Sequence, residues 1–325
     1  MSTMSLGAAL NAGLCAAMEA DDKVVLMGED IGTLGGVFRV TDGLQRRFGA
    51  HRVVDTPLAE SGIVGTAIGL AMRGYRPVCE IQFDGFVYPG FDQIVSQLAK
   101  MRARSNGRIS LPVVIRIPFG GGIGAVEHHS ESNETYFAHT AGLRVVACAE
   151  ANDAYHMIQQ AIRSDDPVIF YEPKRHYWRK SDVDESDQLP LDRAVVRRQG
   201  VDCTLVAYGP TVATAMATAQ AAEEDGYSVG VVDLRSLSPL DLPVLVEQVR
   251  RTGRMVVVHE ASTFLGMGAE IAAAISEACF RDLHAPVLRV GAYNTPYPPA
   301  RVEEHFLPDI DRVLEAVDRT LFFQE

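Results

Sequence analysis

The sequence predicts an α/β fold with two doubly wound domains, each built on a parallel sheet, and three observations support this prediction. Short runs rich in Val and Ile recur between stretches of helical length. These runs are apolar throughout, which is typical of parallel strands buried on both faces. The chain has 325 residues, enough for two domains of ordinary size that each contain a hydrophobic core.

The predicted strands of the first half share an apolar composition and cover residues 23–27, 52–54, 77–83, 112–117, 143–148 and 167–171. Helices are expected between them, because apolar residues recur at every fourth position over 6–18 and similar stripes cover 93–101 and 154–162. A polar, Asp-rich stretch over 181–188 then interrupts the pattern. We therefore expect a first domain over 1–180, a linker over 181–200 and a second domain over 201–325.

The second half repeats the alternation of strands and helices. Strands are predicted at 204–208, 228–234, 255–258 and 287–290, and helices at 211–223, 240–249, 269–279 and 307–322. This half is expected to form a smaller open α/β sheet.

The composition excludes several classes of protein. Hydrophobic residues make up 47% of the chain and charged residues 22%, as in soluble globular proteins. The formal net charge of -12 argues against binding to nucleic acid, which requires clustered Lys and Arg. We find no secretory signal, no apolar run of membrane-spanning length and no C-x-x-C pair among the five cysteines. A cytoplasmic protein with reduced cysteines and no membrane contact is expected.

The segment 55–65, Asp-Thr-Pro-Leu-Ala-Glu-Ser-Gly-Ile-Val-Gly, is the most informative part of the chain. A short strand ends there, Pro57 forces an extended turn, and the following helix carries no charge over 62–72. We expect this helix to be buried and Glu60, at its start, to lose water on one side. A carboxyl in such a place is suited to sharing a proton with a weak base. An acid in the first turn also interacts favourably with the helix dipole, and the spacing alone favours this capping role.

Glycine-rich and histidine-containing segments are the other candidate sites. None of the segments 28–30, 35–36, 120–124 and 266–268 has the dinucleotide-binding spacing, and a Walker lysine is missing. Gly266-Met267-Gly268 precedes a predicted helix, where an anion could bind, but the pattern favours a tight turn. His128 and His129 could transfer protons near neutral pH, whereas their spacing disfavours zinc. A G-x-S-x-G motif, which would support nucleophilic serine chemistry, is missing as well.

Several long motifs follow one another in a fixed order: 55–65, Glu80-Ile81-Gln82-Phe83, Phe91-Asp92-Gln93-Ile94, Gly121-Gly122, His129-Ser130, 166–170, 232–241 and Thr295-Pro296-Tyr297-Pro298. With these motifs the sequence resembles the beta subunit of the thiamine-diphosphate-dependent decarboxylase component of a 2-oxo acid dehydrogenase complex. The resemblance extends over essentially the whole chain.

The resemblance implies a transketolase-like pyrimidine-binding domain followed by a transketolase-like C-terminal domain. It also implies an alpha2beta2 heterotetramer that binds thiamine diphosphate between unlike subunits. In the family, the alpha subunit supplies the Gly-Asp-Gly to Asn-Asn motif that holds Mg2+ and the diphosphate, and the present sequence lacks this motif. The chain is therefore expected to need an alpha subunit, and its C-terminal domain to contact the lipoyl-bearing acyltransferase core.

The resemblance also assigns residues to the cofactor pocket. Glu60 matches the glutamate that hydrogen-bonds the aminopyrimidine ring and shares a proton with it, which now favours a catalytic role for Glu60 over a cap. Leu58, Gln82 and Phe86 match positions that line the pyrimidine pocket. Relatives often carry Tyr at the position of Phe86, so the ring packing is expected here without the hydroxyl.

Two further residues are assigned by resemblance. His129 matches the histidine that is implicated in acyl transfer to the lipoyl group. Asp166 lies near the position of a structural potassium ion in the family and is a candidate ligand.

The substrate is expected to be a small 2-oxo acid. The segments 80–83 and 137–142 look closest to branched-chain members, although members that use pyruvate or acetoin share much of the pattern. An NAD-binding oxidoreductase and a non-catalytic scaffold subunit are the remote alternatives. The missing G-x-G-x-x-G spacing counts against the first, and a Glu60→Gln variant would test the second.

Overall fold

The computed structural model describes residues 2–186 and 189–324, which form two compact units. The first unit extends to Phe119 and includes Tyr136–Leu191, and the second contains Gly120–Thr135 together with the chain from Asp192 onward. The predicted linker over 181–200 is divided between the units. It contains most of strand β8 (Lys180–Val183) and all of β9 (Val195–Arg198), while residues 187 and 188 lie outside the described part of the chain.

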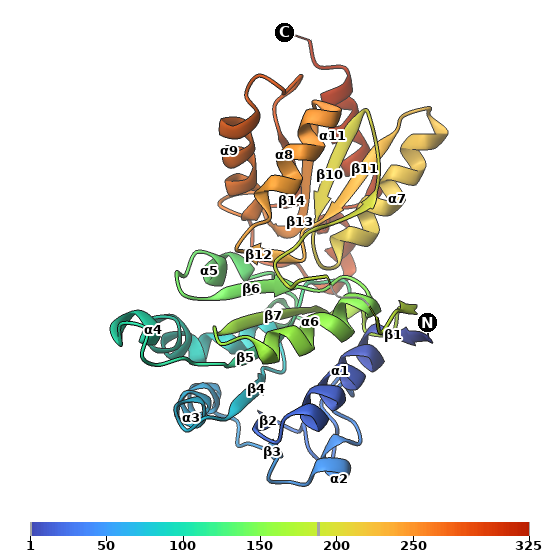
Figure 1. The fold of residues 1–325 in the computed structure, drawn as a ribbon. Helices are drawn as coiled ribbons and strands as arrows, with labels where there is room; N and C mark the ends of the chain where they lie inside the picture. The colour runs from blue at the N-terminus through green and yellow to red at the C-terminus, as the bar shows by residue number, and fades with distance from the viewer. Residues whose placement is uncertain (1, 187–188, 325) are drawn as a thin grey trace. The chain divides into compact units, whose positions relative to one another are not determined.

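The first unit contains a parallel sheet with the strand order β6-β7-β5-β4-β2-β3 (Figure 1). These strands are β2 (Val24–Gly28), β3 (Val53–Asp55), β4 (Arg76–Glu80), β5 (Val114–Phe119), β6 (Arg144–Ala147) and β7 (Val168–Pro173). Each matches a strand predicted for the first half. Every residue of β5 and β7 is buried, as expected for strands covered on both faces.

Helices α1 (Leu6–Ala20) and α6 (Ala151–Arg163) pack side by side and share one hydrophobic core with the sheet. The Ser5 hydroxyl caps α1 by accepting a hydrogen bond from the Ala8 N–H at 3.2 Å. A Cβ atom on Gly13 would lie 2.6 Å from Ile158 Cγ2 and 2.7 Å from the Tyr155 carbonyl oxygen. Glycine is therefore required where the two helices approach each other.

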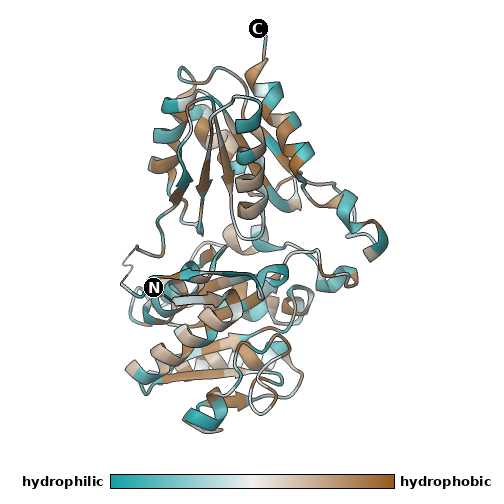
Figure 2. Cartoon of the chain, turned by 90° about the vertical axis from the view of Figure 1, so that its right-hand side faces the viewer, coloured by the Kyte–Doolittle hydropathy of each residue, from teal (hydrophilic) through white to brown (hydrophobic). Residues whose placement is uncertain are grey.

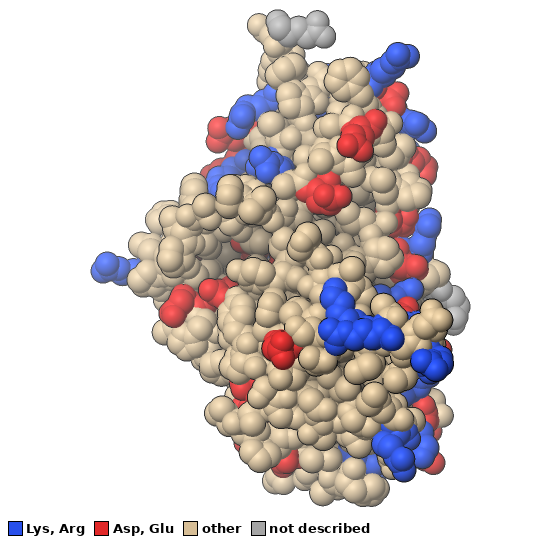
Figure 3. All heavy atoms as spheres, turned by 90° about the vertical axis from the view of Figure 1, so that its left-hand side faces the viewer, with Lys and Arg blue, Asp and Glu red and all other residues tan. Residues whose placement is uncertain are grey.

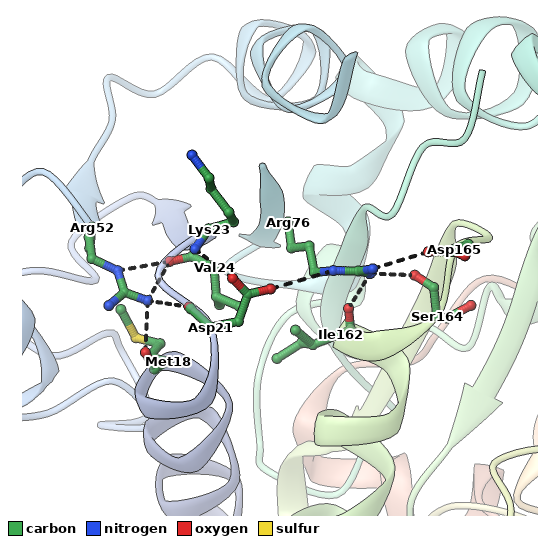
Figure 4. A network of polar contacts seen from close by, with 9 residues as sticks. All are labelled: Met18, Asp21, Lys23, Val24, Arg52, Arg76, Ile162, Ser164 and Asp165. Carbon is green, nitrogen blue, oxygen red and sulfur yellow. Dashed lines mark hydrogen bonds and ion pairs between the residues drawn. The ribbon is translucent and has the colours of Figure 1, made fainter. Parts of the chain in front are cut away.

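Two arginines bind the carbonyl groups at the C-terminal ends of these helices (Figure 4). Arg52 Nη2 donates to the Asp21 carbonyl oxygen at 2.8 Å, and Arg76 Nη1 donates to those of Ile162 and Ser164 at 3.0 Å each. Asp21 connects the two groups, since its carboxylate lies 3.6 Å from Arg76 Nε. The cations satisfy carbonyls that lack helical partners and complement the helix dipoles.

The second unit contains a sheet with the strand order β14-β13-β10-β11-β9, in which β9 is antiparallel to its neighbour and the other pairs are parallel. Its strands and helices are β10 (Cys203–Ala207), α7 (Thr211–Glu224), β11 (Val229–Asp233), α8 (Leu242–Thr252), β13 (Met255–Ser262), α9 (Met267–Cys279), β14 (Leu288–Ala292) and α11 (Ile310–Leu321). These match the predicted elements. In both units the strands are apolar, and the helices present hydrophilic residues as well (Figure 2). The two units are therefore α/β folds of the predicted class.

Shorter elements complete the chain: β1 (Ser2–Ser5), α2 (Leu44–Phe48), α3 (Glu60–Met72), α4 (Met101–Arg104), α5 (Glu134–Ala138), β12 (Ser236–Ser238), α10 (Glu303–Phe306) and short helical turns at Asp84–Gly90, Gln93–Leu98, Glu127–His129, Lys174–His176 and Ala300–Val302. The helix expected over 93–101 is a π-helix over Gln93–Leu98 followed by α4. Strand β1 pairs with β8, and neither was predicted because both are short and partly polar. None of the described helices combines the length and apolar character needed to cross a membrane.

Candidate functional site

Three polar side chains follow the carboxyl ends of neighbouring strands in the first unit. Glu29 follows β2, Glu60 begins α3 after β3, and Gln82 follows β4. Strand β2 lies between β3 and β4, so the chain moves to opposite sides of β2 in successive crossovers. Open α/β sheets bind ligands outside the carboxyl ends of their strands at such a reversal. The candidate site of the first unit lies at this end of β2.

Glu60 is 6% exposed and is the first residue of α3. The preceding turn is held against β2, because the Thr56 N–H donates to the Gly28 carbonyl oxygen at 2.9 Å and Asp55 Oδ1 accepts from the Gly32 N–H at 2.6 Å. This turn places the carboxyl of Glu60 at the buried mouth of the helix. The position suits a first-turn cap, and its burial also provides the desolvation that proton sharing requires.

Helix α3 is buried on one face, which corrects the expectation that the whole helix is buried. Its apolar residues Ile63, Val64, Ala67, Ile68 and Ala71 are buried, whereas the opposite face is exposed. A Cβ atom added at Gly65 or Gly69 would have no described atom within 4 Å. The charge-free sequence over 62–72 therefore combines a buried face with a second, uncharged face that is exposed in this chain.

Glu29 is a site residue that the sequence analysis missed. Burial raises the pKa of its carboxyl above the usual value, and the neighbouring charges of Glu60 and Asp30 raise it further. Its Oε1 atom is buried and has no hydrogen-bond partner among the described residues. The signal in the sequence is an acid directly after an apolar strand, at the second position of Gly28-Glu29-Asp30.

The residues predicted to line the pocket differ in their surroundings. Gln82 Nε2 donates to Asp30 Oδ2 at 3.2 Å and to the Glu29 carbonyl oxygen at 3.4 Å, which holds Gln82 beside the acidic segment. Phe86 is half-buried and packs edge-on against Phe83 with ring centroids 6.1 Å apart. Leu58 is 79% exposed. The first unit thus brings Glu29, Glu60 and Gln82 together and leaves Leu58 facing outward.

A buried ionic cluster underlies this end of the sheet. Arg116 on β5 lies between Glu80 on β4 and Glu172 on β7, and the Tyr177 hydroxyl donates to Glu172 at 2.6 Å. Burial raises the pKa of Glu80, although the attraction of Arg116 opposes this effect. Burial also raises the pKa of Tyr177, and the adjacent Glu172 carboxylate raises it further. The cluster ties together β4, β5 and β7, and β4 is the strand that leads to Gln82 of the candidate site.

Lys174 adds a second buried ion pair, with Asp84. Both side chains are fully buried, and the Lys174 ammonium lies 5.7 Å from the ring centroid of Phe83. The sequence analysis gave no role to this lysine. The pair fixes the segment after β4, which includes Gln82 and Phe86.

His129 belongs to the second unit, in the loop Gly120–Thr135. It ends the short helical turn Glu127–His129, and its ring centroid lies 4.4 Å from that of His128. His128 Nδ1 lies 3.2 Å from Glu127 Oε1, and both of these side chains are about half exposed. His129 is less exposed than His128. The loop therefore presents an imidazole pair in which His129 is the more enclosed member.

The glycines at 266 and 268 serve a buried histidine and do not form an anion site. His259 is fully buried, its Nε2 accepts from the Gly268 N–H at 3.2 Å, and its Nδ1 lies 2.9 Å from the Ala261 carbonyl oxygen. Cβ atoms on Gly266 and Gly268 would lie 2.8 and 2.7 Å from the ring. Burial lowers the pKa of His259 to about 4, so the ring is neutral at pH 7.

Asp166, the candidate potassium ligand, lies among arginines. Its carboxylate forms ion pairs with Arg102 and Arg144, beside a cavity of about 590 Å³ that Lys100 also lines. Figure 3 shows Lys and Arg side chains gathered on the face that carries α4. Among the described residues, no group of three or more His, Cys, Asp or Glu side chains could hold a metal ion. The carboxylate of Asp166 is engaged by protein cations, which gives no support to a ligand role.

Both units match known domain families. The family described as "Transketolase, pyrimidine binding domain" covers residues 2–179, and "Transketolase, C-terminal domain" covers residues 192–313. The fold is also similar to that of a solved protein described as "Split gene transketolase, inactive beta4 tetramer", with a TM-score of 0.82, 23% identity and 99% coverage of both chains. The predicted fold class is confirmed.

Curated relatives define the family further. The chain is 60% identical over 316 residues to a "Pyruvate dehydrogenase E1 component subunit beta" of Leifsonia xyli, covering 97% of this chain and 94% of the relative. It is 52% identical over 321 residues to a "3-methyl-2-oxobutanoate dehydrogenase subunit beta" of Mycobacterium tuberculosis, covering 98% and 92%. A "Pyruvate dehydrogenase E1 component subunit beta" of Staphylococcus epidermidis is 44% identical over 325 residues, with coverage of 99% and 100%. The chain belongs to the transketolase-like E1 beta subunits of 2-oxo acid dehydrogenase complexes, which are oxidoreductases that work with an alpha subunit.

Proposed function

We propose that this chain is the beta subunit of a branched-chain 2-oxo acid dehydrogenase and provides half of a thiamine diphosphate site, with Glu60 as the proton-exchanging carboxyl. The observation that carries the proposal is the burial of Glu60 next to Glu29, at the carboxyl ends of β2 and β3. Acyl transfer to a lipoyl group would complete the reaction. Among the described residues, Cys15, Cys79, Cys148, Cys203 and Cys279 form no disulfide bond, which accords with a reducing cytoplasm.

The residues of the first unit fit an aminopyrimidine. Glu60 can hold a proton at a ring nitrogen, and the half-buried Phe86 provides an apolar ring surface. The buried Oε1 of Glu29 offers a polar contact that no described residue uses. Because the pKa of Glu29 is raised, its carboxyl retains a proton to higher pH than an exposed carboxyl would. Thiamine diphosphate, when bound, supplies the electron sink for loss of CO2 from a 2-oxo acid.

An alpha subunit would complete this site in an alpha2beta2 heterotetramer. Leu58 is exposed beside Glu60, and the uncharged face of α3 with Gly65 and Gly69 is open. An apolar, charge-free surface next to a buried acid is suited to a subunit interface. Mg2+ and the diphosphate are assigned to the alpha subunit, because this chain lacks the Gly-Asp-Gly to Asn-Asn motif.

His129 is proposed to act when the acyl group passes to the lipoyl group of the acyltransferase core. In that step the fragment left by decarboxylation would be oxidised to an acyl group and its two electrons would reduce the lipoyl disulfide, so that the S–S bond breaks, one sulfur takes the acyl group and the other takes a proton. An imidazole can accept a proton at one ring nitrogen and donate one from the other, so His129 is suited to deliver this proton. His128 is more exposed and pairs with Glu127, so no role is assigned to it.

The choice of substrate rests on two segments and one relative. The segments 80–83 and 137–142 and the 52% identity to the Mycobacterium relative favour branched-chain 2-oxo acids. Pyruvate is the second candidate, favoured by the 60% identity to the Leifsonia relative. Initial rates of decarboxylation with pyruvate and with 3-methyl-2-oxobutanoate, by the assembled alpha and beta subunits, would decide between them.

The decisive variant is Glu60→Gln in the assembled heterotetramer with thiamine diphosphate and Mg2+. We expect decarboxylation to fall by about 100-fold or more while assembly and thermal stability are retained, since the amide cannot exchange a proton. Asp311→Asn is the matched control, because Asp311 is an exposed acid in the first turn of α11. If Glu60→Gln lowered only the stability, Glu60 would be a helix cap and the proposed role would be wrong.

A further inference from the structure

The loop that carries His129 is hydrogen-bonded to Glu303, the first residue of α10. The Gly124 N–H donates to Glu303 Oε1 at 2.9 Å, and the Gly122 N–H donates to Glu303 Oε2 at 3.3 Å. The Tyr297 hydroxyl donates to the same Oε2 at 2.8 Å. Glu303 is 8% exposed, so these protein donors replace most of the water around its carboxylate.

A second buried carboxylate holds the start of the loop. Glu260, on β13, is 5% exposed and accepts from the Gly121 N–H through Oε2 at 3.0 Å. The Gly120 N–H donates to the Glu131 carbonyl oxygen at 2.9 Å, which closes the base of the loop. The start of the loop is therefore fixed within the second unit, and its two ends, on either side of His129, are joined to each other.

The glycines of the loop are required by this arrangement. Gly120, Gly122 and Gly124 have φ values of 83°, 83° and 71°, a region that residues with a side chain seldom adopt. A Cβ atom on Gly121 would lie 2.0 Å from the Tyr297 hydroxyl oxygen. The backbone N–H groups turn toward an anion, as in phosphate-binding loops, but the anions are carboxylates of the protein itself.

We propose that Glu303 is a positioning residue for His129, acting through the backbone of the glycine loop with Tyr297 and Glu260 in support. This inference rests on the proposed role of His129 in acyl transfer. The loop contains several residues in left-handed conformations and is largely exposed over 122–128, so it needs external hydrogen bonds to hold one conformation. Glu303 provides two of these bonds through a single buried group.

The substitution Glu303→Gln changes the hydrogen bonding with little change in volume. An amide has one acceptor oxygen and an NH2 group, so one of the two glycine N–H groups would face a donor. We expect the loop to lose order while the folds of both sheets persist. A displaced imidazole would slow the step that depends on its position by about 10- to 100-fold.

The experiment uses the assembled alpha and beta subunits and measures two rates on each variant. One is decarboxylation with ferricyanide as the electron acceptor, and the other is reductive acylation of a free lipoyl domain. For Glu303→Gln we expect the second rate to fall by at least about tenfold with the first rate within about twofold of wild type. The exposed neighbour gives the matched control Glu304→Gln, for which both rates should stay unchanged.

His129→Ala and the double variant separate this inference from the function on which it rests. If His129→Ala loses acylation selectively and Glu303→Gln does not, the positioning role is wrong and the proposed function stands. If His129→Ala leaves acylation intact, the proposed role of His129 fails first. The inference is supported if adding Glu303→Gln to His129→Ala lowers the acylation rate little further. It also requires that the Gly122 and Gly124 amides exchange hydrogen faster in Glu303→Gln than in Glu304→Gln.

Discussion

Arg116 binds Glu172 in a bidentate ion pair, with Nε to Oε1 at 2.6 Å and Nη2 to Oε2 at 2.9 Å. The remaining Nη1 donates to Glu80 Oε2 at 2.6 Å. The Arg116 and Glu172 side chains are 2% and 0% exposed. A planar guanidinium with donors on two edges can satisfy two carboxylates at once, which an ammonium cannot do.

Removing this guanidinium should strongly destabilise the first unit. Arg116→Met would leave two buried carboxylates without their cation, at a cost of about 3–5 kcal/mol in the free energy of unfolding. Urea denaturation at pH 7 measures the change. Arg102→Met, which breaks an exposed pair with Asp166, should cost no more than about 1 kcal/mol and serves as the control. Equal losses in the two variants would contradict the structural role of the cluster.

Glu29→Gln should stabilise the chain at neutral and basic pH. The folded-state pKa of Glu29 is raised above its usual 4.5 by burial and by Glu60 and Asp30, so folding favours the protonated form. The cost of the charged form is absent below pH 4.5 and grows as the pH rises through the folded-state value. The gain in melting temperature over wild type should therefore be larger at about pH 8 than at about pH 4.5.

The exposed Glu224→Gln is the control for Glu29→Gln, and it should show no such change with pH. If the gain in melting temperature for Glu29→Gln stayed constant across this pH range, the pKa of Glu29 in the folded chain would be that of an ordinary carboxyl.

His259 should make the second unit sensitive to acid. Burial lowers the folded-state pKa from 6.5 to about 4, so folding favours the neutral ring. The stabilisation is complete above pH 6.5 and is lost as the pH falls toward 4. Between about pH 7 and pH 5 the loss should amount to about 2 kcal/mol in wild type.

We expect His259→Gln to be less stable than wild type at pH 7, because the glutamine side chain fits the Gly268 N–H and the space around the ring less well. Its unfolding free energy should nevertheless fall less than that of wild type over the same pH range. The quantity to compare is the slope of the unfolding free energy against pH. Parallel slopes for the two proteins would exclude His259 as the source of acid sensitivity.

Gly65→Ala should have opposite effects on the free chain and on assembly. In the free chain the methyl group meets no described atom within 4 Å, and replacing glycine in a helix should add about 0.5–1 kcal/mol to the free energy of unfolding. If the alpha subunit packs on this face of α3, the same methyl should weaken its binding, as measured by titration of labelled subunits.

Gly13→Ala is the matched comparison for the first effect, because its methyl would lie 2.6 Å from Ile158 Cγ2. It should therefore destabilise the free chain. Unchanged affinity of Gly65→Ala for the alpha subunit would place the interface elsewhere.

The sequence predicts well those features that depend on local pattern. The apolar strands, the main helices and the position of Glu60 after a strand all follow from residue periodicity. Strand β8 escapes such analysis, because Lys180-Ser181-Asp182-Val183 has the composition of a loop and is a strand only through its pairing with β1. Glu29 escapes it as well, since its neighbours Glu60 and Gln82 come from the segments that follow β3 and β4.

The glycine loop shows the same limit. Its motif is visible in the sequence, but the groups that its N–H donors bind lie 139 and 179 residues away, at Glu260 and Glu303. No local pattern predicts that these donors meet carboxylates and not a phosphate. The sequence thus locates the loop and leaves its purpose open.

The distance along the chain between the glycine loop and Glu303 also orders events during folding. Glu303 follows all strands of the second sheet along the chain, so during synthesis this contact over 179 residues can form only after those strands have been made. A nascent chain interrupted before residue 303 can already contain the whole parallel sheet of the first unit. In such a chain the histidine loop would have the hydrogen bond from Gly121 to Glu260 but not those from Gly122 and Gly124 to Glu303, so the loop would reach its final conformation only when the last part of the subunit is made.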